Sequence, residues 1–148
     1  MMESLHRYRA LSAADRWLVI EAAMLLAVVR LGIAGVRFSV LRRALDRAAR
    51  GVMRARSAAT PRDVGRVAWS VAAVTRRLPF RSTCLVESLA VDAMLRRRSV
   101  ASEIRFGVRP PGGGALSAHA WVEHRGAVVF GARPDMSDYA VLVPQDAR

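Results

Sequence analysis

The hydrophobic pattern changes its period near residue 100, and this change restricts the fold more than any other feature of the chain. Before it, apolar residues recur at helical spacing, as in Val64, Val67 and Val71. After it, Ile104 and Phe106 alternate with charged residues, as in a strand with one buried face. A helical half followed by strands predicts an α+β fold.

Four helices are expected in the first two-thirds of the chain, over about 12–30, 38–50, 61–78 and 84–98. Thr60 and Pro61 form the start that the third helix needs, with a capping side chain and a proline at the first helical position. Pro79 ends that helix. Ser82 or Thr83 caps the next one.

Four strands are expected over 103–109, 117–124, 127–130 and 139–143. Arg125-Gly126 predicts a hairpin turn between the second and third of them. The proline and glycine run over 110–114 is typical of a flexible surface loop. We therefore expect an N-terminal helical segment, 1–59, and a core of helices and strands, 60–148, packed as one unit.

Charge and cysteine content exclude several classes of protein. The chain has 24 basic residues, all arginine, against 12 acidic ones, and a net charge of +12. A single cysteine, Cys84, excludes an internal disulfide framework and a cysteine-rich zinc site. We expect no metal and no cofactor, because the glycines at 112–114 also lack the strand and helix of a phosphate loop. The run Arg96-Arg97-Arg98 is expected as a solvated helix end, with a dock for an acidic partner as its alternative.

The most hydrophobic stretch, Trp17–Val40, is interrupted by Glu21, Arg30 and Arg37. A membrane span needs about 20 residues with few charges. We expect this stretch to be a helix that packs on the core, with Trp17 and Trp69 as packing anchors and no membrane contact. The alternative is an arginine-rich amphipathic helix that touches anionic lipid. The N-terminus has no pattern of a signal peptide, so the expected location is the cytoplasm.

Cys84 and His119 are the candidate catalytic residues. Cys84 is predicted in the first turn of a helix, where unpaired backbone N–H groups and the helix dipole favour a thiolate nucleophile. His119 follows 35 residues later on a predicted strand. That separation allows the strand to pack beside the start of the cysteine helix, so that an imidazole can serve as the base for the thiol.

These residues stand in motifs that resemble a known family. Ser82-Thr83-Cys84-Leu85 and His119-Ala120-Trp121-Val122-Glu123, followed by Gly126, are similar to motifs of the papain-like transglutaminase core. More narrowly, they resemble the B-type leader peptidases of lasso-peptide biosynthesis. The resemblance extends to the entry Leu11–Trp17 and covers nearly the whole chain. It implies N-terminal helices followed by a catalytic helix packed on a small antiparallel sheet.

The resemblance also implies an activity and partners. Cys84 would attack the peptide carbonyl at the leader–core junction of a ribosomal precursor, and His119 would activate the thiol and protonate the leaving amine. A small recognition-element protein would present the leader of the precursor peptide. A separate ATP-dependent macrolactam cyclase would then use the freed amine. Trp121 and Thr83 are the residues expected to contact the substrate.

The third position of the triad departs from the family. Members often carry an aspartate about a dozen residues after the histidine, where this chain has Gly131. Glu123 shares a strand face with His119, but four residues of strand place it roughly 13 Å away. Asp135 is the favoured substitute and Asp138 the second choice. A dyad whose histidine is oriented by a backbone carbonyl is the remaining alternative.

Two other functions compete with the peptidase. The missing aspartate is compatible with a catalytically inactive transglutaminase-like interaction module. A pI near 11.7 is typical of proteins that bind nucleic acid. However, the chain has no nucleic-acid motif and no interleaved aromatic surface. Thiol reactivity separates the classes, because only the peptidase requires Cys84 to alkylate faster than a free thiol at mildly acidic pH.

Overall fold

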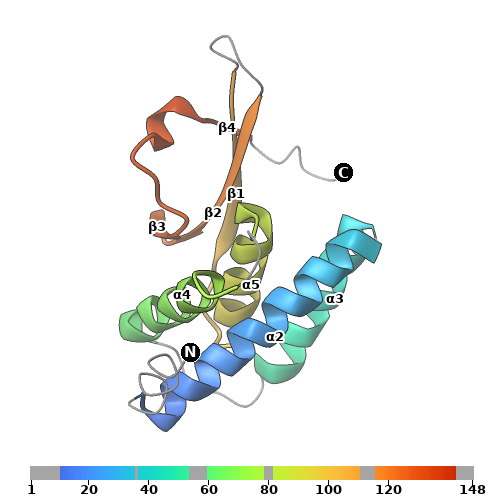
Figure 1. The fold of residues 1–148 in the computed structure, drawn as a ribbon, viewed down its shortest axis with the longest axis vertical. Coiled ribbons are helices and arrows are strands. Elements are labelled where there is room, and N and C mark those ends of the chain that lie inside the picture. Colours follow the sequence, from blue (N-terminus) through green and yellow to red (C-terminus); the bar gives the residue numbers. More distant parts are fainter. Residues whose placement is uncertain (1–10, 36, 54–59, 79–81, 111–115, 143–148) are drawn as a thin grey trace.

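The helices precede the strands, as the change in hydrophobic period predicts (Figure 1). The computed structural model describes residues 11–35, 37–53, 60–78, 82–110 and 116–142. Its helices are α2 (Ala13–Gly35), α3 (Phe38–Met53), α4 (Pro61–Thr75) and α5 (Cys84–Arg96). Its strands are β1 (Glu103–Arg109), β2 (Ser117–His124), β3 (Ala127–Phe130) and β4 (Ala140–Leu142), with the 3-10 turn η1 (Met136–Asp138) before β4. The predicted α+β class is confirmed.

Local signals in the sequence account for the starts and turns of these elements. Thr60 and Asp63 form a capping box at the start of α4, in which Asp63 accepts a bond of 2.8 Å from the Thr60 backbone N–H. Arg125 and Gly126 join β2 to β3 with φ values of 52° and 78°. Positive φ at both central residues is the requirement of a tight primed hairpin turn, so the predicted hairpin is confirmed. Helix α4 ends at Thr75, three residues earlier than expected, and Pro79 lies outside the described residues.

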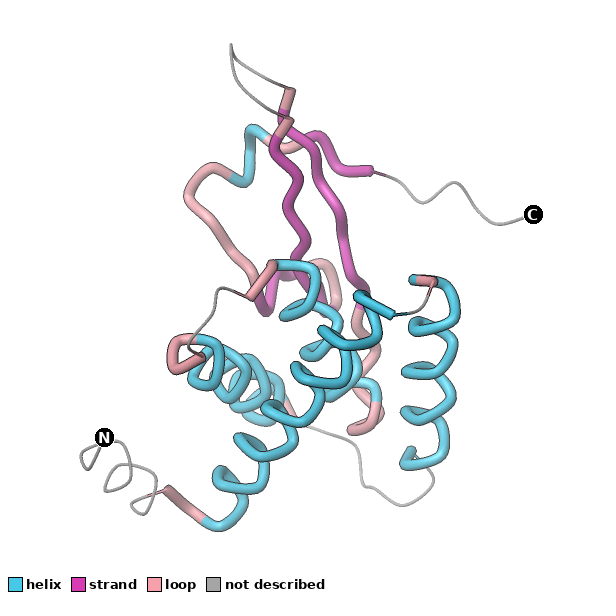
Figure 2. Tube along the Cα trace, turned by 45° about the vertical axis from the view of Figure 1, so that its right-hand side comes forward, coloured by secondary structure: helices cyan, strands magenta, loops and turns pink. Residues whose placement is uncertain are grey.

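The four strands form one antiparallel sheet in the order β3-β2-β1-β4. Strand β1 runs beside β2 over its whole length, and Gly107 is opposite His119. Strand β3 pairs only with the last part of β2, from Val122 to His124. The edge of β2 that carries His119 is therefore not covered by β3. Figure 2 shows β1 and β2 extending beyond the helices, with the segment after β3 running alongside them.

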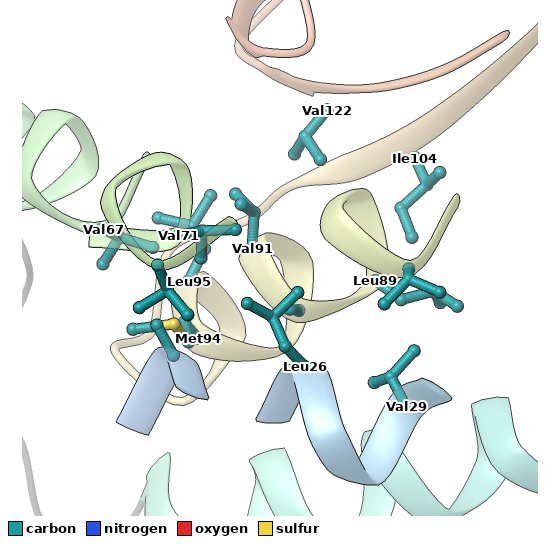
Figure 3. Close-up of a cluster of buried hydrophobic side chains, with 14 of the residues drawn as sticks. Leu26, Val29, Val67, Val71, Leu89, Val91, Met94, Leu95, Ile104 and Val122 are labelled. Carbon is teal, nitrogen blue, oxygen red and sulfur yellow. The ribbon is translucent and has the colours of Figure 1, made fainter. Parts of the chain in front are cut away.

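One hydrophobic cluster joins the helices to one face of the sheet (Figure 3). Helix α5 lies at its centre, and every residue of α5 from Ser88 to Leu95 is buried. The cluster includes residues from both expected segments, 1–59 and 60–148. Its large members include Leu26, Val29, Val67, Val71, Leu89, Val91, Met94, Leu95, Ile104 and Val122.

Helix α2 packs on this cluster with one face only. By length and composition it could cross a membrane, with a mean hydropathy of 2.1 over 18 residues, of which 28% are buried. Leu18, Ala22 and Leu26 are on the buried side, whereas Trp17 is 57% exposed. Trp69 on α4 is 40% exposed. The prediction that both tryptophans are packing anchors is therefore wrong. A helix that is apolar all round does not indicate which face the core will take.

Salt bridges at the end of α5 fix α2 in place. Glu21 of α2 is 5% exposed and pairs with Arg97, at 3.2 Å, and with Arg98. Arg96 pairs with Asp92 at 2.9 Å and with Asp46 at 3.4 Å. Removing one partner of a buried pair is costly, because it leaves the other charge without compensation. The arginine run is thus neither the solvated helix end nor the free dock expected from the sequence.

Candidate active site

Cys84 is the first residue of α5, as predicted. Thr83 precedes it as the N-cap, and its hydroxyl accepts a hydrogen bond of 3.4 Å from the Val86 backbone N–H. Cys84 is half-buried and its thiol is not in a disulfide. Thr83 is exposed, so its observed role is to begin the helix that carries the nucleophile.

His119 is held in a fixed orientation on β2. It is 9% exposed, and its ring stacks on Trp121 with centroids 6.0 Å apart. Tyr139 lies on a second side, at 5.7 Å. The ring atom Nε2 is 2.7 Å from the carbonyl oxygen of Gly131. A carbonyl oxygen can only accept, so Nε2 carries the hydrogen, and in the neutral ring Nδ1 keeps the lone pair. Nδ1 is therefore the nitrogen available as a base.

Gly131 occupies the position where the resemblance implies an aspartate, and its backbone makes the contact. Its φ of +82° lies in the left-handed region that favours glycine. A Cβ there would lie 3.1 Å from the Trp121 Cα and 3.2 Å from the Ala120 carbonyl oxygen. Glycine thus permits both the turn and the close approach to β2. The geometry matches the alternative of a dyad oriented by a backbone carbonyl.

Asp135 and Asp138 do not contact the His119 ring in the structure. Asp135 accepts bonds of 2.8 Å from Arg133 and 3.1 Å from Arg109. The hydrogen bond from Arg133 is the main reason that the pKa of Asp135 is lowered. Asp138 is 3.7 Å from Arg109. The prediction that Asp135 completes the triad is corrected by these contacts, because two arginines hold the carboxylate and Gly131 bonds His119 Nε2.

A buried hydrogen bond brings the cysteine helix to the histidine strand. The Ser88 hydroxyl donates to the Ala120 carbonyl oxygen at 3.1 Å. Ser88 is four residues after Cys84 and shares its helix face, and Ala120 adjoins His119. In the described part of the chain, no hydrogen bond joins the Cys84 thiol to His119. Such bonds are often long before substrate binds.

The segment after β3 contacts His119 and also carries a paired arginine and aspartate. Gly131 contacts His119, and two residues later Arg133 donates to Asp135 at 2.8 Å. The hydrogen bond and charge of Asp135 raise the pKa of Arg133, and Cys84 contributes to the same direction. Asp135 is therefore engaged with Arg133 instead of orienting the imidazole.

Glu87 is a site residue that sequence reasoning missed. It is half-buried on α5, three residues after Cys84. Burial raises the pKa of Glu87, and a hydrogen bond from Ser82 and the charge of His119 oppose the rise. The charge of His119 is the smallest of these three effects. The spacing of Glu87 from Cys84 is the signal that could have identified it, because residues three apart lie on neighbouring parts of one helix face.

Trp121 is buried, at 2% exposed, and therefore supports the site from within. Its Nε1–H donates to Glu123 Oε1 at 2.8 Å. Glu123 also pairs with Arg105 at 3.1 Å, so it is engaged away from His119, as the strand spacing predicts. The expected substrate contact of Trp121 is not what the structure shows, because His119 and the segment after β3 cover this face. Among the described residues, no group of three His, Cys, Asp or Glu side chains could hold a metal ion.

Comparison with known proteins gives one match. The family model described as the transglutaminase-like superfamily matches residues 23–144. This range includes most of α2 and all four strands, and it contains Cys84, Glu87, His119 and Gly131. No curated protein and no solved structure matches the chain significantly.

Proposed function

We propose, because the chain belongs to the transglutaminase-like superfamily, that it is a cysteine peptidase. The proposed substrate is a ribosomally made lasso-peptide precursor, from which the enzyme removes the leader. The superfamily fold is consistent with cysteine peptidase chemistry. The precursor as substrate is argued from the motifs around Cys84 and His119, which resemble those of leader peptidases.

In the proposed reaction, Nδ1 of His119 takes the proton from the Cys84 thiol. The thiolate attacks the carbonyl carbon of the bond between leader and core, and the protonated ring then gives its proton to the leaving amine of the core. Water hydrolyses the resulting thioester with the leader. The bond between Nε2 and the Gly131 carbonyl supports this assignment, because it keeps Nδ1 free to move the proton.

The proposed partners are those that the resemblance to leader peptidases implies. A recognition-element protein presents the leader of the precursor peptide, and a macrolactam cyclase uses the freed core amine. The peptidase and its partners are proposed to act in the cytoplasm.

One geometric observation carries the proposal: the bond between His119 Nε2 and the carbonyl of Gly131. The test is to incubate the protein with its candidate precursor, with and without the recognition-element protein, and to follow the masses of the products. Cleavage at a single bond, lost in Cys84→Ala and in His119→Ala, is the expected result.

A negative result must be separated from a misfolded enzyme. Each variant is therefore compared with the native protein by circular dichroism and by thermal unfolding. The alkylation rate of Cys84 is measured against free cysteine at mildly acidic pH. A folded protein that neither cleaves the precursor nor alkylates faster than free cysteine would support the inactive interaction module instead.

A further inference from the structure

The exposed side of α2 carries a stripe of large apolar side chains. Trp17, Ile20, Met24, Val28 and Leu31 are 57%, 41%, 53%, 54% and 73% exposed. Their positions differ by three or four residues, so they follow one side of the helix. At 1.5 Å per residue the stripe is roughly 21 Å long. Isolated exposed apolar residues are ordinary, but a continuous apolar surface indicates an interaction site.

The chemistry of this face favours a lipid surface over a protein partner. Apart from Arg30, every exposed residue of α2 is apolar or glycine. Protein interfaces carry about one hydrogen bond per 100–200 Å², and a face without polar side chains supplies none from them. The hydrocarbon of a membrane requires no hydrogen bonds from the face that it covers. A tryptophan at one end of the stripe suits the boundary between acyl chains and headgroups.

Exposed arginines that follow α2 in the chain match an anionic surface. Arg37, Arg43 and Arg47 are exposed on α3 and its approach. In the described part of residues 11–53, the three acidic residues are all paired with arginines: Asp15 with Arg66, Glu21 with Arg97 and Arg98, and Asp46 with Arg42 and Arg96. The charge left unneutralised on α2 and α3 is therefore positive, and a positive charge attracts lipid phosphates.

We infer that the exposed face of α2 binds the surface of an anionic membrane. The helix would lie in the plane of the headgroups with the stripe from Trp17 to Leu31 among the upper acyl carbons. It would not span the bilayer, because its opposite side is part of the protein core and Glu21 is fixed to Arg97 and Arg98. This inference replaces the expectation of no membrane contact, and it does not depend on the proposed peptidase activity.

The test uses the full-length protein and vesicles. One set contains phosphatidylglycerol mixed with phosphatidylcholine, and the other contains phosphatidylcholine alone. Co-sedimentation is expected with the first set, and the binding constant should fall as salt is raised, because salt screens the arginines. Tryptophan emission should shift to shorter wavelength on binding, and Trp17→Phe should remove that shift. Equal binding to both sets of vesicles, or binding to neither, would overturn the inference.

A pair of variants tests the face itself. Leu31→Asp places a charge on the stripe. Leu116→Asp is the control, because Leu116 is also well exposed, at 65%, but immediately precedes β2 and is not on α2. Loss of about tenfold or more in vesicle affinity is expected for Leu31→Asp only. Thermal unfolding checks that both variants fold. Unchanged vesicle binding by Leu31→Asp would overturn the inference. So would a dimer of the native protein, seen by light scattering, that Leu31→Asp abolishes while vesicles are not bound.

Discussion

The Gly131 carbonyl performs only part of the task of a triad carboxylate at His119. In a complete triad, one acid both fixes the tautomer of the histidine and stabilises the imidazolium that forms. Here the Gly131 carbonyl fixes the tautomer, and it carries no net charge. Glu87 is half-buried on α5, three residues after Cys84, and burial is the main cause of its raised pKa. We predict that Glu87, in its ionised form, supplies the negative charge that a carbonyl cannot.

The carbonyl contact predicts that Gly131→Ala impairs both stability and cleavage. The alanine must adopt a φ of +82° and place its Cβ 3.1 Å from Trp121. We expect a loss of about 1–2 kcal/mol in the free energy of unfolding and a fall in kcat for precursor cleavage. Gly126→Ala is the matched control, because Gly126 has a φ of +78° but open space around it. If Gly126→Ala lowers kcat as much, the carbonyl contact is not the cause.

The pairing of Asp135 with two arginines predicts a mild effect of Asp135→Asn. Replacing the acid of a working triad by asparagine lowers kcat by about 10⁴. Since Asp135 bonds Arg133 and Arg109 rather than His119, we expect kcat to change by less than about tenfold. The measurement is kcat for precursor cleavage at neutral pH. A fall approaching that of the triad example would restore Asp135 as the third catalytic residue.

Glu87 predicts opposite effects on stability and on activity. Burial raises the pKa of Glu87, so folding favours its protonated form. The contribution of Glu87 to the free energy of unfolding is fully present when the pH is below the pKa of glutamate in the unfolded chain. This contribution is lost as the pH rises through the pKa of Glu87 in the folded protein. Glu87→Gln should therefore unfold at a higher Tm than the native protein at neutral pH, and the difference should vanish in acid.

The same variant should cleave the precursor more slowly, because the imidazolium loses a nearby negative charge. Thermal unfolding and precursor cleavage are measured on the same samples across the pH range. A Tm for Glu87→Gln that is unchanged at every pH would contradict the burial argument. Unchanged cleavage would contradict the role beside His119.

At the scale of whole elements, the site depends on the way α5 meets the edge of β2. Strand β3 ends early, and Ser88 of α5 reaches the Ala120 carbonyl next to His119. Both residues are buried, so the hydrogen bond is not exchanged for water. The helix start that carries Cys84 is thereby held against the strand that carries His119.

Ser88→Ala should therefore weaken the site as well as the fold. A buried carbonyl left unsatisfied costs about 1–3 kcal/mol of unfolding free energy. Ser70→Ala is the control, because Ser70 is equally buried but donates to Val67 of its own helix. We expect both variants to be less stable, and only Ser88→Ala to slow the alkylation of Cys84 and the cleavage of the precursor. Equal effects of the two variants on alkylation would show that the bond between α5 and β2 does not position the thiol.

For the whole molecule, the helices before residue 60 are part of the core. Leu18, Ala22, Leu26 and Val29 of α2 share one cluster with residues of α4, α5 and β2. Glu21 also compensates the charges at the end of α5. The family match begins at residue 23 and so includes most of α2.

A chain that begins at Thr60 should consequently fail to fold. The truncated chain lacks α2 and α3, so the apolar side of α5 is exposed. We expect the protein to precipitate or to show no cooperative unfolding transition. Circular dichroism with thermal unfolding measures this, and the full-length protein is the reference. A truncated protein that unfolds cooperatively and keeps the fast alkylation of Cys84 would show that the helices are only a platform for partners.

The sequence by itself determined the elements and the two candidate catalytic residues. Capping residues, prolines and the period of apolar residues act over a few positions, so the helix starts, the hairpin and the α+β class were all predictable. The motifs around Cys84 and His119 likewise identified them without a structure. The helix ends were less certain, because α4 stops three residues early without a local signal.

Tertiary structure decided which groups surround those two residues and which surfaces face solvent. A contact made by a backbone carbonyl, such as that of Gly131, cannot be recognised from the type of residue. The two arginines that bind Asp135 come from a distant strand and from the loop that contains Asp135. Helix α2 is apolar all round, so only packing could choose the buried face and leave Trp17 exposed. Local propensity is encoded position by position, whereas these contacts depend on long-range packing that a pattern of residue types does not specify.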